Sequence, residues 1–446
     1  MKTTLFVMLP VVSHYNACFG LAATLREQGD RVVFTGTPDL RDYVEREGFS
    51  FIPMRYMEEY VIPNVRVAVG LFIKSRADNH FLRRRYREFW SSVLDFRRVY
   101  QAVAPDAVYL DQHLNHYYFL LEPEDRNVVL LNTKLPTRRA KCIPPLTCAI
   151  PFRQKGYYRV YADLLWTLFS VRRSLVDRLR TIVLSGRDDS FFLSRCAKRN
   201  GLDYDQQVRR DNALYVSIKN VDIIHLRPRL IEYDWYKPIE GEQFAYFPYG
   251  RNSTPTPGQT AIWNDLLQLI EEQKQHGRFI LYASLGTLSG LNAQAAISFL
   301  RRLIESVGKM ADAYLVISAG GLTRFLSESL PANATLFEWV PQPNLLNYCD
   351  LMITHGGMNS ICDCLSAGVP MLVYPLNFNS DQPGSAARVV AKGWGLTGNL
   401  RRDSPKQIGS KVQQLVTDKE ISQRVKSCRL VSVADEYQKM DLAESR

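Results

Sequence analysis

Short runs of apolar, often β-branched residues alternate along this chain with longer segments whose apolar side chains recur every three or four positions. The strand-like runs in the first half are residues 4–12, 31–35, 50–53, 106–110, 128–132, 213–217 and 222–225. Those in the second half are residues 279–283, 314–318, 334–338, 351–354 and 371–375. Buried strands that alternate with helices are typical of doubly wound parallel sheets. The pattern therefore predicts an α/β protein.

The length of the chain indicates more than one domain. It has 446 residues, which is more than one ordinary hydrophobic core accommodates. We predict two Rossmann-like domains, at residues 1–235 and 259–420, because each range holds its own set of strands. Residues 236–258 are rich in Pro, Gly, Tyr and Thr, which is typical of an interdomain linker. The final stretch, residues 421–446, is predicted to be helical.

Basic residues outnumber acidic ones, 56 to 45, which gives a net charge of +11. This balance favours anionic partners such as nucleotides, acidic acceptors or membrane surfaces. Basic and aromatic side chains are interleaved in two helical stretches, residues 65–102 and 153–192. For residues 65–102 a solvated face is the simplest interpretation, and the alternative is a border of the acceptor pocket that also contacts an anionic membrane through residues 66–98. Residues 153–192 are interpreted as further wall of the acceptor pocket. No nucleic-acid module accompanies the charges, so nucleic acid is not an expected partner.

The cysteines and the hydropathy pattern bear on the compartment. The eight cysteines show no C-x-x-C ligand spacing, so the simplest interpretation is a reduced chain without a structural metal. The N-terminal apolar run is short and soon meets polar residues, which favours a buried strand over a signal peptide. No window of about 18 apolar residues predicts a transmembrane helix. We expect a cytoplasmic protein, with peripheral contact at the inner face of the membrane as the alternative.

A candidate anion site follows the strand at residues 351–354. Gly356 and Gly357 open the next predicted helix, whose unpaired N–H groups and positive dipole end attract phosphate. His355, Asn359 and Ser360 supply side-chain donors at the same point. Asp363 lies on the same helix face one turn further on, where a carboxylate could accept hydrogen bonds from ribose hydroxyls. For the two glycines alone, a simple strand-to-helix turn is an equally good interpretation.

The spacing of polar residues around this helix resembles the donor signature of UDP-glycosyltransferases in glycosyltransferase family 1, including its bacterial natural-product branch. The residues that carry the resemblance are Trp339, Pro341-Gln342, His355, Gly357, Asn359-Ser360, Gly368-Val-Pro370 and Asp381-Gln382. The resemblance implies the GT-B fold, in which two Rossmann-like domains face each other and a C-terminal helix returns to the first domain.

The resemblance also implies a role for each donor-site residue. Trp339 would stack on uracil and Val340 would pair with its edge through the backbone. Gln342 and Asp363 would hold the ribose. The diphosphate would be bound by His355, Asn359 and Ser360, together with the loop residues Ser284, Gly286 and Thr287. Asp381 and Gln382 would bind hydroxyls of the transferred sugar. Two positions depart from the usual pattern: Asp363 replaces a more common Glu, and Met358 stands where an aromatic or other large residue is frequent.

A catalytic pair is predicted near the start of the chain. His14 follows the first predicted strand, at the end of a sheet where ligands bind in α/β proteins. The segment resembles the family's Gly-His-x-Asn-Pro loop, with Ser13 and Ala17 replacing Gly and Pro. Asp111 ends another strand, and a carboxylate there would orient the imidazole of a general base. A structural His14 and a helix-capping Asp111 are the alternatives.

Two further histidines, His113 and His116, are interpreted as acceptor-pocket or surface residues, because no carboxylate or cysteine set completes a metal site around them.

Together these features predict an inverting glycosyltransferase that moves a hexose from a UDP-sugar to a hydroxyl of a small hydrophobic or aromatic acceptor. His14 would be the general base, and neither a metal nor another cofactor is expected. Gln382 favours glucose through the resemblance, and a thymidine diphosphate donor is an alternative. Three other functions stay open: transfer to a membrane lipid or carotenoid-like acceptor, nucleotide-sugar epimerisation, and a non-catalytic partner with the same fold.

Overall fold

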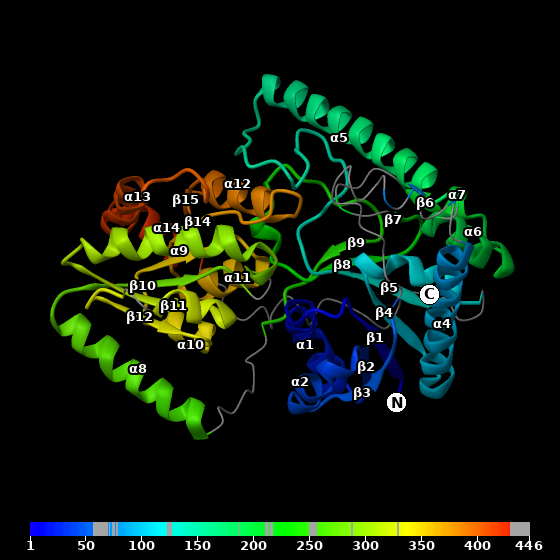
Figure 1. The fold of residues 1–446 in the computed structure, drawn as a ribbon, viewed down its shortest axis with the longest axis horizontal. Helices are drawn as coiled ribbons and strands as arrows, with labels where there is room; N and C mark the ends of the chain where they lie inside the picture. Colours follow the sequence, from blue (N-terminus) through cyan, green and yellow to red (C-terminus); the bar gives the residue numbers. More distant parts are fainter. Residues whose placement is uncertain are drawn as a thin grey trace. The chain divides into compact units, whose positions relative to one another are not determined.

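The computed structural model describes residues 1–56, 70, 72–73, 76, 79–122, 127–186, 188–209, 214, 217–248, 257–286, 289–327 and 330–428. The chain divides into two compact units, each with its own parallel sheet (Figure 1). The first comprises Met1–Lys141, Arg159–Leu226 and Lys237–Asn252. The second comprises Cys142–Tyr158, Arg227–Tyr236 and Ser253–Arg446.

The sheet of the first unit has the strand order β3-β2-β1-β4-β5-β8-β9, and every pairing in it is parallel. Its strands are β1 (Thr3–Val7), β2 (Arg31–Gly36), β3 (Ser50–Pro53), β4 (Ala107–Asp111), β5 (Val128–Asn132), β8 (Ile223–His225) and β9 (Glu242–Phe244). A separate antiparallel pair joins β6 (Val208–Arg209) to β7 (Ser217–Ile218).

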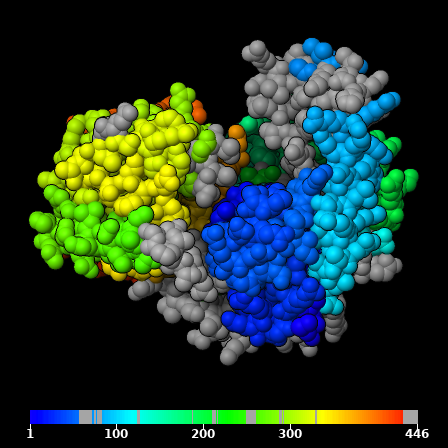
Figure 2. All heavy atoms as spheres, turned by 60° about the horizontal axis from the view of Figure 1, so that its bottom comes forward, coloured from blue at the N-terminus to red at the C-terminus, as the bar shows by residue number. Residues whose placement is uncertain are grey.

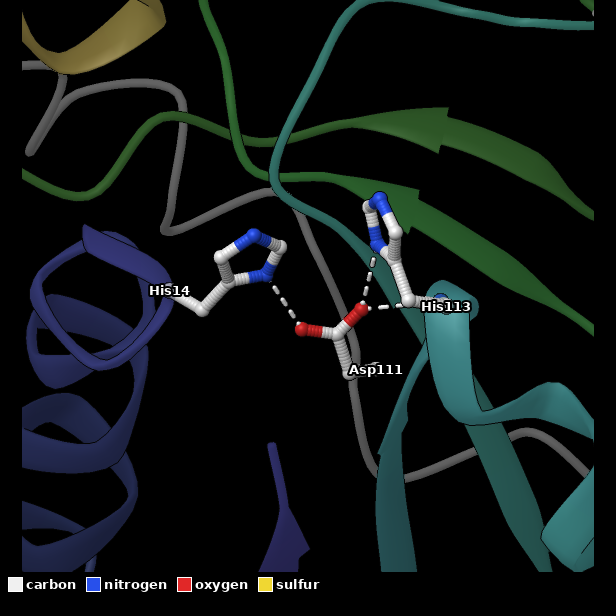
Figure 3. Close-up of side chains that lie close together, drawn as sticks. All are labelled: His14, Asp111 and His113. Atoms are coloured by element: carbon white, nitrogen blue, oxygen red, sulfur yellow. Dashed lines mark hydrogen bonds and ion pairs between the residues drawn. The ribbon is translucent and has the colours of Figure 1, made fainter. Parts of the chain in front are cut away.

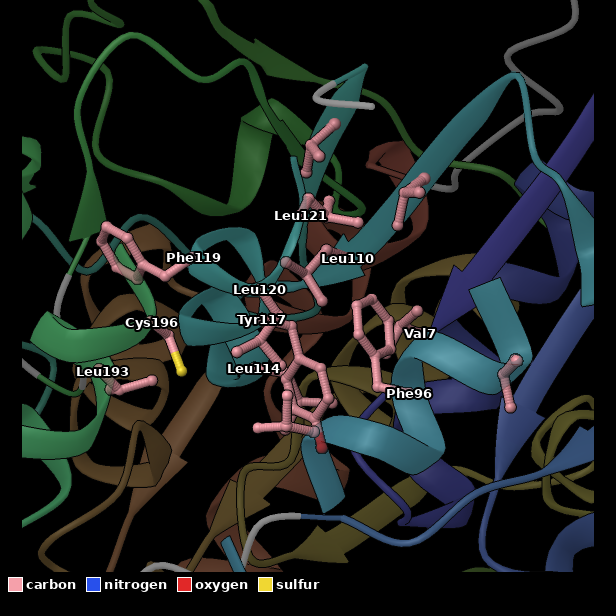
Figure 4. Close-up of a cluster of buried hydrophobic side chains, with 14 of the residues drawn as sticks. Val7, Phe96, Leu110, Leu114, Tyr117, Phe119, Leu120, Leu121, Leu193 and Cys196 are labelled. Carbon is pink, nitrogen blue, oxygen red and sulfur yellow. The ribbon is translucent and has the colours of Figure 1, made fainter. Parts of the chain in front are cut away.

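Helices cover both faces of this first sheet, as the alternation of side chains along a strand requires. Leu5 and Val7 of β1 lie in one hydrophobic cluster with Phe96 of α4 (Asn79–Val103) (Figure 4). Phe6 points to the other face and stacks on Phe34, which contacts Phe19 of α1 (Val12–Glu27). In Figure 2, the light blue to cyan atoms of α4 lie beside the blue atoms of the N-terminal part of the chain, in agreement with the contact between α4 and β1.

The remaining helical segments of the first unit connect or flank these strands. They are η1 (Pro38–Leu40), α2 (Arg41–Arg46), η2 (Gln112–Leu120), α5 (Gly156–Val183), α6 (Asp189–Arg199) and α7 (Tyr204–Gln207). The first three residues of α5 belong to the second unit. Because η2 follows β4 directly, it carries its histidines past the carboxyl end of the sheet.

The sheet of the second unit has the order β12-β11-β10-β13-β14-β15 and is also entirely parallel. Its strands are β10 (Phe279–Ser284), β11 (Ala313–Ser318), β12 (Ala334–Phe337), β13 (Leu351–Thr354), β14 (Met371–Val373) and β15 (Gly395–Thr397). Its α-helices are α8 (Pro257–Gln275), α9 (Ala293–Gly308), α10 (Gln342–Leu346), α11 (Met358–Ala367), α12 (Gln382–Lys392), α13 (Pro405–Thr417) and α14 (Lys419–Ser427). Its 3₁₀ helices are η4 (Arg229–Ile231), η5 (Ser289–Asn292) and η6 (Gly320–Phe325).

Strand interiors and α9 form the core of the second unit. Leu281, Leu315 and Leu351 of neighbouring strands lie in one cluster with Phe299 of α9 and Ile408 of α13. Consecutive buried residues in these strands fit a sheet that is covered on both faces. The doubly wound α/β class predicted from the sequence is confirmed in both units.

Several elements differ from the sequence prediction, among them the start of α1 and the strand β9. The run at residues 4–12 was predicted to be a single strand, but β1 ends at Val7 and α1 begins at Val12. The predicted loop around His14 is therefore the first turn of a helix, and tertiary packing overrides the β propensity of the two valines before it. The predicted linker, residues 236–258, also contains a strand, β9, at the edge of the first sheet.

Some predicted segments lie wholly or partly outside the described residues. These are most of the strand at 213–217, residues 57–69 of the basic region, and the C-terminal stretch after Cys428. The predicted domain limits and the return of a C-terminal helix stay predictions. In the part of the chain that the structure describes, no helix is both long and apolar enough to cross a membrane.

One ion pair fixes the segment Arg227–Tyr236 within the second unit. Arg388 of α12 donates from Nε and Nη2 to the two carboxylate oxygens of Glu232, at 2.7 and 2.9 Å, and both side chains are fully buried. The guanidinium also lies over the ring of Tyr233 and donates to the carbonyl of Gly384. These contacts satisfy a buried charge that would otherwise be costly.

Candidate functional site

The predicted pair His14 and Asp111 is brought together in the first unit (Figure 3). Nδ1 of His14 lies 2.6 Å from Oδ2 of Asp111, and Oγ1 of Thr133 lies 3.2 Å from the same nitrogen. Asp111 is fully buried at the end of β4, and His14 is 7% exposed in the first turn of α1. The bond to the carboxylate fixes the proton on Nδ1, so Nε2, which points away from Asp111 in Figure 3, is the acceptor nitrogen.

Asp111 is shared with a second imidazole. Its Oδ1 accepts from both the backbone N–H and Nδ1 of His113, each at 2.9 Å. Burial opposes the charge of Asp111, but the contacts with His14 and His113 hold the pKa of the carboxyl well below its usual range. Burial lowers the pKa of His113 to about 4 in spite of its bond to Asp111, so this ring is neutral near pH 7.

The sequence interpretation placed His113 in an acceptor pocket or at the surface and did not connect it with Asp111. The capping role given as the alternative for Asp111 is also present, since its side chain accepts from the backbone N–H of His113 in η2. The catalytic and capping interpretations of Asp111 are thus compatible. Within the described residues, His14, Asp111 and His113 are the set whose ligand atoms lie close enough together to hold a metal ion, within 4.8 Å of one another.

On the donor side, the glycine-rich turn before α11 is built around His355. A Cβ on Gly357 would lie 2.6 Å from Nε2 of His355, and a Cβ on Gly286 would lie 2.5 Å from its Cε1. Gly286 and Gly356 have φ values of +79° and +87°, which only glycine adopts readily. The loop after β10 and the turn before α11 can therefore pack against the His355 ring only because Gly286 and Gly357 have no Cβ.

The His355 ring presents an unused polar atom at the start of α11. Its Nδ1 is buried without a hydrogen-bond partner among the described residues. Burial lowers the pKa of His355 to about 4, against the influence of the nearby Asp381 carboxylate, so the ring is neutral near pH 7. Gly357 is the N-cap residue of α11 and has no side chain that could accept a hydrogen bond from the first N–H groups of the helix. Polar groups so placed suit an anion.

Two predicted ribose-binding residues contact each other directly. Nε2 of Gln342 donates to Oδ2 of Asp363 at 2.7 Å and lies 3.4 Å from Oγ of Ser360. Gln342 opens α10, whereas the other two residues lie on one face of α11, as their spacing predicted. The shorter side chain of Asp363 is thus long enough to reach Gln342.

Arg227 stands beside the same helix start, and sequence reasoning did not identify it. It is buried, and its Nη2 donates to Oδ1 of Asn359 at 2.8 Å. An amide whose oxygen is engaged in this way directs its NH₂ group elsewhere. No local pattern links two residues that are 132 positions apart, so the sequence offered no signal for this contact.

The other predicted donor residues occupy varied environments. Trp339 is 48% exposed, whereas Val340 and Met358 are buried. Asp381 is buried at the start of α12. Oε1 of Gln382 accepts from the backbone N–H groups of residues 376 and 377, both at 2.8 Å, so the NH₂ group is the part of this side chain that can meet a ligand.

The loop after β10 is described only in part. Ser284 ends β10, and its Oγ lies 3.5 Å from the backbone nitrogen of Gly286. Thr287 lies outside the described residues.

The first unit also contains a cavity of about 610 Å³ that sequence reasoning missed. Its wall includes Gln112, which follows Asp111 in the chain, and the buried His225 and Glu242. Nε2 of His225 donates to Oε1 of Glu242 at 2.8 Å, and Asn132 donates to the other ring nitrogen at 2.8 Å. Arg138 completes the network with bonds of 2.9 and 3.1 Å to Glu242. The wall of this cavity thus contains a buried polar network that reaches Asn132, the sequence neighbour of Thr133, which contacts His14.

A protein-family model and curated relatives each match a part of the chain. The family model is described as "Erythromycin biosynthesis protein CIII-like, C-terminal domain" and matches residues 301–436. A zeaxanthin glucosyltransferase of Pseudescherichia vulneris is 33% identical over 152 residues, 33% of this chain and 35% of that protein. The NDP-glycosyltransferase YjiC of Bacillus subtilis is 34% identical over 126 residues, 28% of this chain and 29% of that protein. The matched stretches thus span about a third of these relatives.

Solved structures match nearly the whole chain. The glycotransferase of kitacinnamycin covers 96% of this chain and 94% of its own, with a TM-score of 0.66 and 18% identity. Glycosyltransferase VinC, solved with dTDP, covers 98% and 95%, with a TM-score of 0.59 and 15% identity. These matches show that the chain has the fold of these glycosyltransferases, the GT-B fold predicted from the sequence. The resemblance to natural-product enzymes of glycosyltransferase family 1 is confirmed.

Proposed function

We propose that this chain, which shares its fold with natural-product glycosyltransferases, is itself an inverting glycosyltransferase that moves a hexose from a nucleoside diphosphate sugar to an acceptor hydroxyl. The observation that carries the proposal is the 2.6 Å contact between His14 and the fully buried Asp111. A buried carboxylate behind an imidazole is the arrangement of an oriented general base.

In this mechanism, Nε2 of His14 removes the proton of the acceptor hydroxyl. The oxygen forms a bond to the anomeric carbon while the bond from that carbon to the diphosphate breaks, so the configuration at the carbon inverts. Asp111 stays ionised, because its pKa is lowered, and stabilises the imidazolium that forms. His113 supports the same carboxylate through its two bonds to Oδ1.

The helix start of α11 supports the binding of the diphosphate leaving group. His355, Asn359, Ser360 and Thr287 would donate to its oxygens, and the positive end of the helix dipole would favour its growing charge. Arg227 adds a cation beside Asn359 and fixes the amide so that its NH₂ group can donate. With these groups in place, the proposed mechanism invokes no metal ion.

The remaining donor contacts follow the signature. Trp339, about half exposed, is free to stack on the nucleobase, while Val340 would pair through its backbone. Gln342 and Asp363 would hold the ribose as the pair that they already form. Asp381 and the NH₂ group of Gln382 would bind the sugar. We propose UDP-glucose as the donor; the dTDP complex of the structurally similar VinC supports dTDP-glucose as the alternative.

We propose a small hydrophobic or aromatic alcohol as the acceptor. The cavity beside Gln112 is the candidate pocket, since its polar network reaches the residues next to His14. A carotenoid-like or lipid acceptor is the second candidate, and the name of the zeaxanthin glucosyltransferase, which matches a third of this chain, favours it.

Release of nucleoside diphosphate tests this proposal. UDP-glucose and dTDP-glucose are each supplied with and without a panel of phenols, carotenoid diols and lipid alcohols. Three proteins are compared: the native chain, His14→Ala, and His276→Ala as a control at an exposed histidine. We expect acceptor-dependent release by the native and control proteins and its loss in His14→Ala.

The other outcomes separate the alternatives. Equal release by His14→Ala would remove His14 from the role of base. Conversion of the sugar without acceptor would indicate an epimerase. If no nucleotide sugar were consumed by any of the three proteins, the chain would be a non-catalytic partner with a glycosyltransferase fold.

A further inference from the structure

Helix α5 carries an apolar stripe that faces away from the protein. Val160, Leu164, Leu168, Val171, Leu175 and Leu179 are between 45% and 71% exposed. Their spacing of three and four residues places all six on one side of the helix. The helix has 28 residues and is therefore about 42 Å long, so the stripe is a continuous apolar strip on its surface.

The stripe is one of three distinct faces of α5. Ala162, Trp166 and Val183 are buried and attach the helix to the protein. Thr167 and Ser174 lie on an exposed polar face, one position before Leu168 and Leu175. The helix therefore has an attached face, a polar face and an apolar face, and the apolar one is larger than isolated surface leucines would explain.

The charges of the helix indicate what covers the stripe. Five arginines and two aspartates lie within α5. By helical geometry Arg172 and Arg178, both exposed, border the apolar stripe on either side. Two copies of this helix would bring like charges together if they packed through their stripes. An anionic surface would instead pair with these arginines, and the net charge of +11 acts in the same direction.

We infer that α5 docks the protein in the plane of an anionic lipid surface. A helix with an apolar face bordered by arginines lies at the boundary between headgroups and acyl chains, with leucines in the apolar layer and guanidinium groups at the phosphates. This surface differs from the basic segment 66–98 considered from the sequence, and the inference does not depend on the proposed transfer reaction.

Vesicle sedimentation tests the inference directly. The probes are vesicles of phosphatidylcholine alone and vesicles that also contain phosphatidylglycerol. The key variant is Leu168→Glu/Leu175→Glu. Its matched control is Thr167→Glu/Ser174→Glu, which adds the same two charges in the same turns but on the polar face. All four positions are exposed, so the melting temperature and circular dichroism should match those of the native chain.

We expect the native chain and the control to sediment with phosphatidylglycerol vesicles and to be released by high salt. The leucine variant should bind at least about 10-fold less, because it removes two apolar anchors and adds charge at the membrane. Absence of binding by the native chain, equal binding to phosphatidylcholine alone, or equal loss in both variants would each overturn the inference. So would a native dimer, seen by analytical ultracentrifugation, that only the leucine variant disrupts.

Discussion

The imidazole of His355 lies so close to Gly286 that a Cβ on that glycine would come within 2.5 Å of Cε1 and 2.9 Å of Nε2. Gly286 follows β10 and His355 follows β13, two strands paired in parallel at the centre of the second sheet. The ring therefore occupies the space that a side chain at 286 would need, and the absence of a Cβ there is a requirement of the site.

Gly286→Ala tests this packing. We expect it to lower stability by about 1–3 kcal/mol, because alanine is strained at φ +79° and its methyl group would displace His355. Affinity for UDP or dTDP should fall roughly 10-fold as the ring moves. Calorimetric titration and thermal unfolding measure the two effects. Gly290→Ala is the control, since a Cβ there meets nothing within 4 Å; equal behaviour of the two variants would contradict the argument.

Asp111→Asn should lower the rate of transfer by roughly 10²–10⁴-fold, because an amide neither fixes the Nδ1 proton of His14 nor stabilises the imidazolium. The Michaelis constant for the donor should change little. His113→Gln should cost much less, since the bond between His14 and Asp111 stays. The comparison is made by steady-state kinetics over a range of pH, and a native rate for Asp111→Asn would rule out this pair as the catalytic base.

Removal of metal ions should leave the transfer rate unchanged. In the structure the two Nδ1 atoms of His14 and His113 are already paired with Asp111, so a metal there would have to displace both hydrogen bonds. Dialysis against a chelator, followed by assay with and without added Zn²⁺ or Mg²⁺, measures this. A loss of activity that a metal restores would instead assign these three residues as its ligands.

Glu232→Gln should destabilise the protein by about 3–5 kcal/mol, since it leaves the fully buried Arg388 without its counter-charge. Denaturant unfolding is the measurement. The control is Asp234→Asn, which breaks the ion pair with Lys392 at an aspartate side chain that is 87% exposed and should cost at most about 1 kcal/mol. If Glu232→Gln cost no more than Asp234→Asn, the buried pair would not hold the segment Arg227–Tyr236.

His116 should make the protein sensitive to acid. Burial lowers its pKa to about 4, and its Nε2 has no hydrogen-bond partner among the described residues. The unfolded chain therefore binds the proton more readily between pH 4 and about 6.5, so the free energy of unfolding falls as the pH is lowered through this range.

His116→Leu should reduce this pH dependence by on the order of 1–2 kcal/mol. The measurement is the difference in unfolding free energy between pH 7.5 and pH 5. The exposed His276→Leu serves as the control. A variant at 116 with the native pH slope would show that this ring is protonated without cost in the folded state.

Much of the fold follows from local patterns. The period and composition of residues 31–35, 128–132 and 351–354 predicted β2, β5 and β13 closely, because a buried parallel strand needs a short apolar run wherever it occurs. The two glycines before α11 could also be recognised in the sequence, because Gly356 has a positive φ and Gly357 has no room for a Cβ beside His355. The start of α1 was missed because the valines at 11 and 12 favour a strand locally, whereas packing decides for a helix.

By itself, the sequence determined the doubly wound α/β class, most of the strands of the two parallel sheets, and the residue types at the candidate donor site. Only the tertiary structure decided that Asp111 stands between His14 and His113, that Arg227 holds Asn359, and that Glu232 pairs with Arg388. The physical reason is the distance along the chain over which each kind of interaction acts. Periodicity and turn chemistry act over a few residues, whereas these contacts join residues up to 156 positions apart, and they exist only once the sheets have set the positions of their strand ends.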